Sequence, residues 1–267
     1  MEKFTSDLIR TLVRDRYAKA AQGSPCGCGS SSASGCCGDR PGHPDAVGRI
    51  LGYSDGDLGS VVEGANLGLG CGNPTAIGSL RPGETVLDLG SGGGFDCFIA
   101  ARHVGEGGKV IGVDMTPEML AKARENAEKT GASNVEFRLG EIEHLPVADQ
   151  SVDVIISNCV LNLSPEKEQV FREAWRVLKP GGRLAISDVV AIADMPDNLR
   201  QQAALMTGCI AGAERIDRLE AILAGIGFQD IHIRPKSYSR ELVRDWFPES
   251  GAEQYVASAD IEAVRPV

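Results

Sequence analysis

"TVLDLGSGGGFD", residues 85–96, joins a short apolar strand to the start of a helix through a turn of glycines. An apolar run that ends in such a turn is typical of a buried strand in a parallel α/β sheet. Glycine is needed in the turn because the backbone comes close to a bound ligand and adopts torsions that a Cβ atom resists. The segment therefore predicts a strand–turn–helix unit whose turn lines a ligand site, and the turn comprises Gly90, Ser91, Gly92, Gly93 and Gly94.

The pattern of apolar strand and helix continues to residue 190. Strands are predicted at 85–90, 109–114, 134–140, 152–158 and 182–190. Helical spacing of apolar residues separates them at 95–104, 117–130 and 165–178. Apolar strands that alternate with helices predict a parallel sheet covered on both faces, which is an α/β, Rossmann-like fold.

The regions on either side of this core have other patterns. Apolar residues have helical spacing over 5–22, and helices are predicted over 195–207 and 214–225. Strands at 230–236 and 254–264 would complete a seven-stranded, mostly parallel sheet. We therefore expect an N-terminal helix with a cysteine- and glycine-rich lid segment (1–80), a ligand-binding core (81–193), and C-terminal substrate-covering helices with closing edge strands (194–267).

The composition of the chain argues against some classes of binding partner. The chain has 267 residues, 42% hydrophobic content and a formal net charge of -10, which argues against a surface that collects nucleic-acid phosphates or anionic lipid. The start, MEKFTSDLIRTLVRDRYAKAA, is charged and has no apolar signal region, and nothing later approaches the roughly 20 apolar residues of a membrane span. The sequence therefore predicts a cytoplasmic protein with neither a nucleic acid nor a membrane as its partner.

Acidic residues follow the predicted strands where α/β sheets bind ligands. Asp88 ends the first strand, and Asp114 ends the second, 24 residues after Gly90, where a carboxylate can accept both hydroxyls of a ribose. The third strand is followed by GEIEHLP, which we expect to hold an adenine edge near Ile142 and Glu143. A dinucleotide-binding enzyme shares these features, but the acidic residue before the glycines and the lack of a second glycine-spaced nucleotide half in the sequence oppose it.

Eight cysteines are many for a chain without a secretory signal. Cys26, Cys28, Cys36 and Cys37 cluster in PCGCGSSSASGCCGDRPG (25–42), whereas the other four are scattered. We interpret Cys97, inside the helical stretch FDCFIAARHV, as a packing residue. The remaining three are expected to meet at the carboxyl edge of the sheet: Cys71 on the loop EGANLGLGCGNP, Cys159 after the strand 152–158, and Cys209 at the end of the helix that follows the strand 182–190.

Three thiols without a nearby histidine indicate a soft, thiophilic centre rather than a hard cation with oxygen ligands. A zinc site would usually have a fourth protein ligand or an activated water bound to the metal. The competing interpretation is that each free cysteine simply packs as a small hydrophobic residue.

The turn DLGSGGG together with LKPGGRLAISD (178–188) resembles the class I methyltransferases that bind S-adenosylmethionine. The resemblance covers residues 81–190. It implies that Asp88 and the turn Gly90 to Gly94 approach the methionine end of the cofactor, and that Asp114 holds the ribose. It also implies that Met115, Ile142 and Glu143 flank the adenine and that Asn158 lies beside the cofactor.

A closer resemblance, over about residues 45–267, is to the arsenite methyltransferase family. The segments that carry it are GANLGLGCGNP, VLDLGSGGGFDCFIAARHVGEGGKVIGVDMTPEML, SNCVLNLSPEKEQVFREAWRVLKPGGRL and GCIAGA. It implies that Cys71, Cys159 and Cys209 bind trivalent arsenic and that Cys36 or Cys37 of the CCG motif takes part in a redox cycle. Some members have a longer C-terminal extension, which we expect this chain to lack.

The resemblance implies a simple mechanism. Arsenic(III) held by three thiolates keeps a lone pair that attacks the sulfonium methyl, so neither a general base nor a catalytic metal is expected, and no role is assigned to His43, His103, His144 or His232. The expected substrates are arsenite or its glutathione conjugate, and methylarsenite. A thiol pair would return arsenic to the trivalent state, with thioredoxin or another dithiol as the reductant.

Two alternatives stay open at this point. One is a methyltransferase for a small organic acceptor, such as a quinone precursor, with incidental cysteines. The other is a protein that sequesters arsenic or zinc through the N-terminal cysteine cluster, in which Cys26 and Cys28 would only capture the metalloid.

Overall fold

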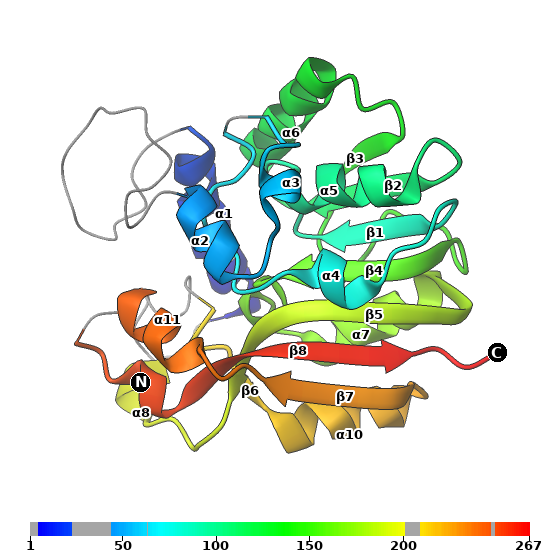
Figure 1. Ribbon diagram of the computed structural model, residues 1–267. Coiled ribbons are helices and arrows are strands. Elements are labelled where there is room, and N and C mark those ends of the chain that lie inside the picture. Colours follow the sequence, from blue (N-terminus) through cyan, green and yellow to red (C-terminus); the bar gives the residue numbers. More distant parts are fainter. Residues whose placement is uncertain (1–4, 23–43, 63, 201–208, 247–248) are drawn as a thin grey trace.

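The computed structural model describes residues 5–22, 44–62, 64–200, 209–246 and 249–267. Its centre is one sheet with the strand order β3-β2-β1-β4-β5-β8-β7, and a two-residue strand β6 pairs with β5 (Figure 1). The strands are β1 (Thr85–Leu89), β2 (Lys109–Asp114), β3 (Val135–Leu139), β4 (Val152–Asn158), β5 (Leu178–Ala191), β6 (Glu214–Arg215), β7 (Gln229–Pro235) and β8 (Val256–Val264). The α/β fold with a mostly parallel sheet is confirmed.

Strand direction changes at one edge only. β1 to β5 pair in parallel, whereas β8 is antiparallel to both β5 and β7. The two predicted closing strands at 230–236 and 254–264 are therefore confirmed to within two residues. The short strand β6, which pairs with the end of β5, was not predicted.

The start of β5 differs from the prediction. We expected a helix to residue 178 and a strand from 182, but α7 (Lys167–Val177) ends earlier and β5 begins at Leu178. The reason is that LKPGG looks like a turn in the sequence, yet Leu178 pairs with Val152 before a register shift, and the amide of Gly181 donates to the carbonyl of Arg265 (2.8 Å). Pairing with residues distant in the chain thus places residues that favour turns within a strand of the sheet.

Helices cover both faces of the sheet. On one face α7 and α10 (Ile216–Ile226) pack together over a core that includes Phe171 and Leu223. On the other, α5 (Phe95–Val104) and α6 (Pro117–Thr130) enclose a second apolar cluster in which Cys97 is fully buried, as predicted. Because α10 packs against α7, this part of the C-terminal region lies on the sheet, and the predicted substrate-covering role of the region stays a prediction.

The remaining helices gather mainly at one end of the sheet. They are α1 (Ser6–Ala21), α2 (Pro44–Ile50), α3 (Asp55–Leu58), α4 (Pro74–Gly78), α8 (Asp197–Arg200) and α11 (Ser239–Trp246), with the 3-10 turns η1 (Leu161–Leu163) and η2 (Ala252–Gln254). Figure 1 shows α1 and α2 beside the carboxyl ends of β1, β4 and β5, the end where ligands bind in open α/β sheets. α2, α3, α4 and α11 were not predicted, and most of the helix expected at 195–207 lies outside the described residues. Within the described part of the chain, no helix has the length and apolar character needed to cross a membrane.

Candidate functional site

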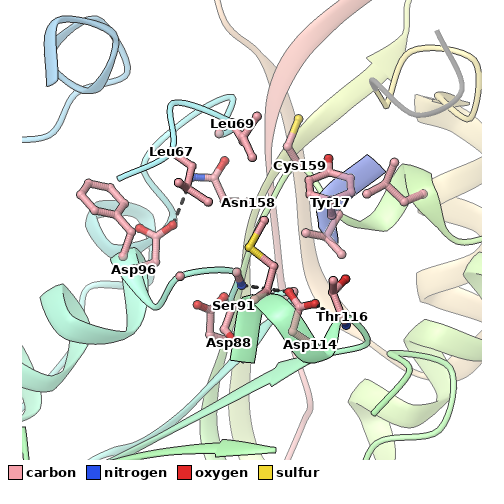
Figure 2. Close-up of a pocket in the computed structure, with 18 of the residues that line it drawn as sticks. Tyr17, Leu67, Leu69, Asp88, Ser91, Asp96, Asp114, Thr116, Asn158 and Cys159 are labelled. Carbon is pink, nitrogen blue, oxygen red and sulfur yellow. Dashed lines mark hydrogen bonds between the residues drawn. The ribbon is translucent and has the colours of Figure 1, made fainter. Parts of the chain in front are cut away.

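A cavity of about 1190 Å³, open to solvent on one side, lies at the carboxyl end of the parallel strands. Figure 2 shows Cys159 at one end of it and Asp88, Ser91 and Asp114 at the other. Every residue predicted to bind the cofactor lines this cavity except Gly94, and those that do are Asp88, Gly90, Ser91, Gly92, Asp114, Met115, Ile142, Glu143 and Asn158.

The glycine turn after β1 is shaped by close contacts. Gly90 has φ +73°, and a Cβ atom there would lie 2.4 Å from a methyl of Val160. Gly94 has φ +91°, but a Cβ there would meet the rings of Phe98 and Phe137 rather than the cavity. Gly94 thus allows close packing at the start of α5, and its contact with the cofactor stays a prediction.

Backbone amides hold Asp114 at the end of β2. Its Oδ2 accepts from the amide of Gly92 (2.9 Å), and its Oδ1 accepts from the amide of Thr116 (2.8 Å). Burial raises the pKa of the Asp114 carboxyl, and these hydrogen bonds oppose that shift. The carboxylate is thus fixed between the turn and the start of α6.

Ser91 has a hydroxyl that the protein leaves unsatisfied. Its Oγ is buried and has no hydrogen-bond partner among the described residues, although Ser91 lines the cavity. A buried hydroxyl without a partner carries a free-energy cost, which a polar group of a ligand in the cavity would remove.

Two further buried carboxyls, those of Asp88 and Asp96, lie near the glycine turn. The thiol of Cys97 donates to Oδ2 of Asp88 (3.2 Å), and the phenol of Tyr53 donates to Oδ1 of Asp96 (2.6 Å). Burial raises the pKa of Asp88 well above its usual range and raises that of Asp96 to about 6. Sequence reasoning missed Asp96 and Tyr53, because an acidic residue in the first turn of a helix is common and Tyr53 is far away in the chain.

Asn158 connects the two ends of the cavity. Its Oδ1 accepts from the amide of Cys71 (2.8 Å), and its Nδ2 donates to the carbonyl of Gly72 (2.8 Å). The same Nδ2 lies 3.0 Å from the phenol of Tyr53 and 3.2 Å from Oδ2 of Asp96. One side chain therefore holds the loop of Cys71 in place against the cofactor end.

α1 closes the cavity over Glu143. The guanidinium of Arg10 lies 3.3 Å from Glu143, 3.6 Å from Glu141 and 3.5 Å from Glu166. Glu143 is almost fully buried and also accepts from the hydroxyl of Ser164 (2.6 Å). The carboxylate that we predicted to face adenine is thus already paired, and sequence reasoning missed both of its partners.

The structure brings the three predicted thiols together. Cys71, Cys159 and Cys209 are 0%, 6% and 2% exposed and share one apolar cluster. The thiol of Cys209 donates to the carbonyl of Cys159 (2.7 Å), and that of Cys71 donates to the carbonyl of Ser187 (3.3 Å). Hydrogen bonds with the other two thiols, followed by burial, raise the pKa of Cys159 well above its usual range.

The backbone at two of these cysteines is unusual. Cys159 has φ +62° and Cys209 has φ +69°, a region that residues with a side chain rarely adopt. Such conformations cost free energy and cluster at functional sites. They turn the chain sharply at the end of β4 and before α10.

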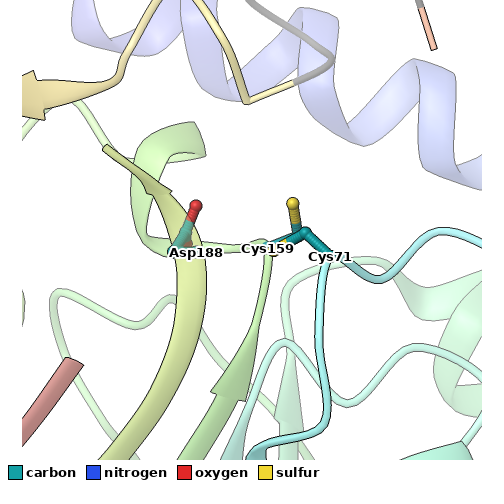
Figure 3. Close-up of side chains that lie close together, drawn as sticks. All are labelled: Cys71, Cys159 and Asp188. Carbon is teal, nitrogen blue, oxygen red and sulfur yellow. The ribbon is translucent and has the colours of Figure 1, made fainter. Parts of the chain in front are cut away.

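Asp188 of β5 is a further member of this cluster. One of its carboxylate oxygens and the sulfurs of Cys71 and Cys159 all lie within 4.8 Å of one another (Figure 3). Burial raises the pKa of Asp188 to about 6. The sequence contains a signal that we missed, since LAISDVVA places one acidic residue inside an otherwise apolar strand.

Tyr17 of α1 lies beside Cys159 in the cavity wall (Figure 2). Burial, followed by the nearby Cys209 and Cys159, raises the pKa of its phenol well above the usual range. Tyr17 belongs to the segment 5–22, for which the sequence predicted only a helix. Cys26, Cys28, Cys36 and Cys37 lie outside the described residues, so their predicted roles stay predictions.

A family model described as a methyltransferase domain matches residues 80–234. The chain is 55% identical over 264 residues to an arsenite methyltransferase of Halobacterium salinarum, which covers 96% of this chain and 66% of that protein. It is 43% identical over 152 residues to the human arsenite methyltransferase, covering 54% of this chain and 40% of that protein. The chain thus spans about two fifths to two thirds of the length of these relatives.

A solved structure is similar as well. It is the arsenic(III) S-adenosylmethionine methyltransferase of Chlamydomonas reinhardtii, which is 35% identical to this chain with a TM-score of 0.61. The match covers 83% of this chain and 73% of that one.

Proposed function

Because this chain belongs to the arsenite methyltransferase family of class I methyltransferases, we propose that it transfers methyl groups from S-adenosylmethionine to trivalent arsenic. The observation that carries the proposal is the meeting of Cys71, Cys159 and Cys209, from three distant segments, in one buried cluster, of which Cys159 lines the cavity. A packing role for each cysteine separately would not require them to converge.

The cavity fits the methyl donor. S-adenosylmethionine supplies a methyl group on a positively charged sulfonium sulfur when it is bound. Asp114 would accept from the ribose hydroxyls, and Asp88 and Asp96 would face the cationic amino-acid end, since all three carboxyls line the cavity. The unsatisfied hydroxyl of Ser91 and the close backbone of Gly90 also fit a polar ligand at the turn.

The thiols would hold arsenic as the nucleophile. Arsenite loses its three hydroxyl groups as water, each taking the proton of one thiol, and three sulfur–arsenic bonds form. Arsenic keeps its lone pair, which carries no proton, so no general base is needed. Burial of the cluster and the ring of Tyr17 exclude water from the attacking atom.

The redox part of the function is also a proposal. Methyl transfer formally oxidises arsenic to the pentavalent state, and return to the trivalent state needs two electrons. A pair of thiols that includes Cys36 or Cys37 would supply them by forming a disulfide with loss of two protons, and thioredoxin or another dithiol would then reduce that disulfide. Methylarsenite and a glutathione conjugate of arsenite are the further substrates we propose. We further propose a reducing, cytoplasmic setting, in which the arsenic-binding thiols stay free.

The test is methylation of arsenic by the purified protein. With S-adenosylmethionine, arsenite and a thiol reductant, we expect methylated arsenic to be released, and we expect Cys159→Ser to abolish it while binding of S-adenosylmethionine persists. Cys97→Ser is the matched control for arsenic binding, because Cys97 is equally buried but lies in a different cluster. An unchanged product profile in Cys159→Ser contradicts the three-thiol site. Methyl transfer that is indifferent to thiol alkylation favours an organic acceptor.

A further inference from the structure

We propose that Asp188 is a catalytic residue of methyl transfer, whose negative charge stabilises the positive charge that arsenic acquires on accepting the methyl group. The inference rests on the proposed function. Asp188 belongs to β5 and is fully buried, and Figure 3 shows it beside the cysteines. Because its carboxylate oxygen and the sulfurs of Cys71 and Cys159 are mutually within 4.8 Å, an atom bonded to both sulfurs lies next to the carboxylate.

The charge on arsenic changes only in the chemical step. Three neutral thiols and arsenite give a neutral tris-thiolate complex and three waters, so capture of arsenic leaves the net charge of the cluster unchanged. In methyl transfer, the lone pair of arsenic forms the arsenic–carbon bond, the carbon–sulfur bond breaks, and its electron pair stays on the sulfur. One positive charge thereby moves from sulfur to arsenic.

A fixed anion beside arsenic therefore favours the transition state over the bound substrate. Such selective stabilisation accelerates a reaction, whereas an interaction of equal strength with both states only tightens binding. The effect is large in a buried site, because the low dielectric weakens charge–charge interactions less than water does. Asp188 is the acidic residue that the structure places within this distance of both sulfurs.

The carboxylate is oriented by neutral groups. It accepts from the amides of Leu161 (2.8 Å) and Val189 (2.7 Å) and from the side-chain amide of Asn162 (2.9 Å). Among the described residues, no lysine or arginine forms an ion pair with it within 4.0 Å. Its charge is thus held in place without being cancelled by a contact cation.

One cation acts on Asp188 from farther away, and a second acts on Cys209. The amine of Lys167, at the start of α7, donates to the carbonyl of Ser164 (3.3 Å), and its charge opposes that of Asp188. The charge of Arg16 lowers the pKa of Cys209, whereas the charge of Asp188 raises it. Removal of a cation should therefore change the methyl-transfer rate in the opposite direction to removal of the carboxylate charge.

The experiment compares Asp188→Asn with the wild type in three assays. In a single turnover of the protein loaded with arsenite and S-adenosylmethionine, we expect the rate of methyl transfer to fall about 10- to 100-fold. Arsenite affinity, measured without the methyl donor, should stay within about twofold because the captured arsenic is uncharged. Iodoacetamide should alkylate Cys209 faster in the ligand-free variant, since the anion at position 188 raises the pKa of that thiol.

Lys167→Met is the second variant. At about pH 8, where Asp188 is ionised, we expect it to increase the single-turnover rate about two- to fivefold, since methionine fills similar space without the opposing charge. Asp153→Asn is the matched control. Asp153 is also a strand carboxylate that accepts from a backbone amide, that of Thr85 (2.8 Å), and lies near a lysine, but it is at the opposite end of β4. All three assays should match the wild type in this control.

The outcomes separate the inference from the function on which it rests. A wild-type protein that methylates no arsenic overturns both. An active wild type with an equal single-turnover rate in Asp188→Asn overturns the inference alone. A loss of arsenite affinity as large as the loss of rate also overturns it, because that result assigns Asp188 a structural role. If Asp188→Asn does not fold, a single-turnover rate of methyl transfer that is lower in Lys167→Met than in the wild type overturns the inference.

Discussion

The two ends of the cavity are built in different ways. At the cofactor end, the neighbouring parallel strands β1 and β2 pair through their backbones, and the amide of Gly92 in the turn after β1 donates to the carboxylate of Asp114 at the end of β2. At the thiol end, three segments that are far apart in the chain meet through side chains, chiefly Asn158 and the thiols themselves. A site made from adjacent strand ends follows from local sequence, whereas a site made from distant loops depends on what holds the loops.

This difference predicts that damage to the cofactor end stays local. Asp114→Ala removes the acceptor proposed for the ribose, the hydrogen bond to the turn and the hydrogen bond to the start of α6. We expect the dissociation constant of S-adenosylmethionine to rise about 100- to 1000-fold, as judged by isothermal titration calorimetry. The number of arsenite molecules bound per protein should not change. A parallel loss of arsenite binding would show that the two ends are not independent.

We expect a substitution of Asn158 to affect ligand binding at both ends of the cavity. Asn158→Leu keeps the size of the side chain but leaves the amide of Cys71 and the carbonyl of Gly72 without their partner. We expect the affinities for arsenite and for S-adenosylmethionine each to fall about 10- to 100-fold, measured by titrating each ligand separately. In the control Asn134→Leu, which loses an amide bonded to two backbone carbonyls outside the cavity, both affinities should be retained.

Buried carboxyls should make the ligand-free protein less stable as the pH rises. The folded-state pKa of Asp96 is about 6 because of burial, above its value of roughly 3.9 in an unfolded chain. Between these values the folded state retains a proton that the unfolded state has lost, so stability is greatest below about pH 4 and falls as the pH rises to about 6. The contribution is on the order of 3 kcal/mol, since one pKa unit corresponds to about 1.4 kcal/mol.

Urea unfolding at several pH values between about 4 and 7 measures this effect. Asp96→Asn should flatten the decrease in the free energy of unfolding, because asparagine does not titrate. An equally steep decrease in the variant would assign the pH dependence to other groups.

The smallest expected effect concerns α1. Arg10→Met removes the ion pairs that tie α1 to Glu143, Glu141 and Glu166. We expect S-adenosylmethionine to dissociate about two- to fivefold faster, in a stopped-flow displacement assay, and the rate to depend less on salt than in the wild type. Arg14→Met is the control on the same helix, since Arg14 is more exposed and, among the described residues, forms an ion pair only with Glu141 (3.8 Å). Equal effects of the two substitutions would contradict a specific role for Arg10.

Much of the fold and of the cofactor end could be predicted from the sequence. The strand–turn–helix unit, Asp88, Asp114 and the parallel strands depend on local periodicity and on residues at strand ends, which are visible without a structure. The position of Cys97 in a packed helix was visible for the same reason. Errors arose where distant contacts override local preference, as in LKPGG, which joins β5.

The thiol end required the tertiary structure. The sequence alone placed Cys159 near the carboxyl edge of the sheet, since it follows a strand. It also placed Cys71 there, on a glycine-rich loop. Only the folded chain decided that Asn158 fixes that loop, that Arg10 of α1 pairs with Glu143, and that Asp188 lies next to the sulfurs. The physical reason is that a strand period places a residue on a face or at an end, whereas contact between side chains depends on how separate segments pack against one another.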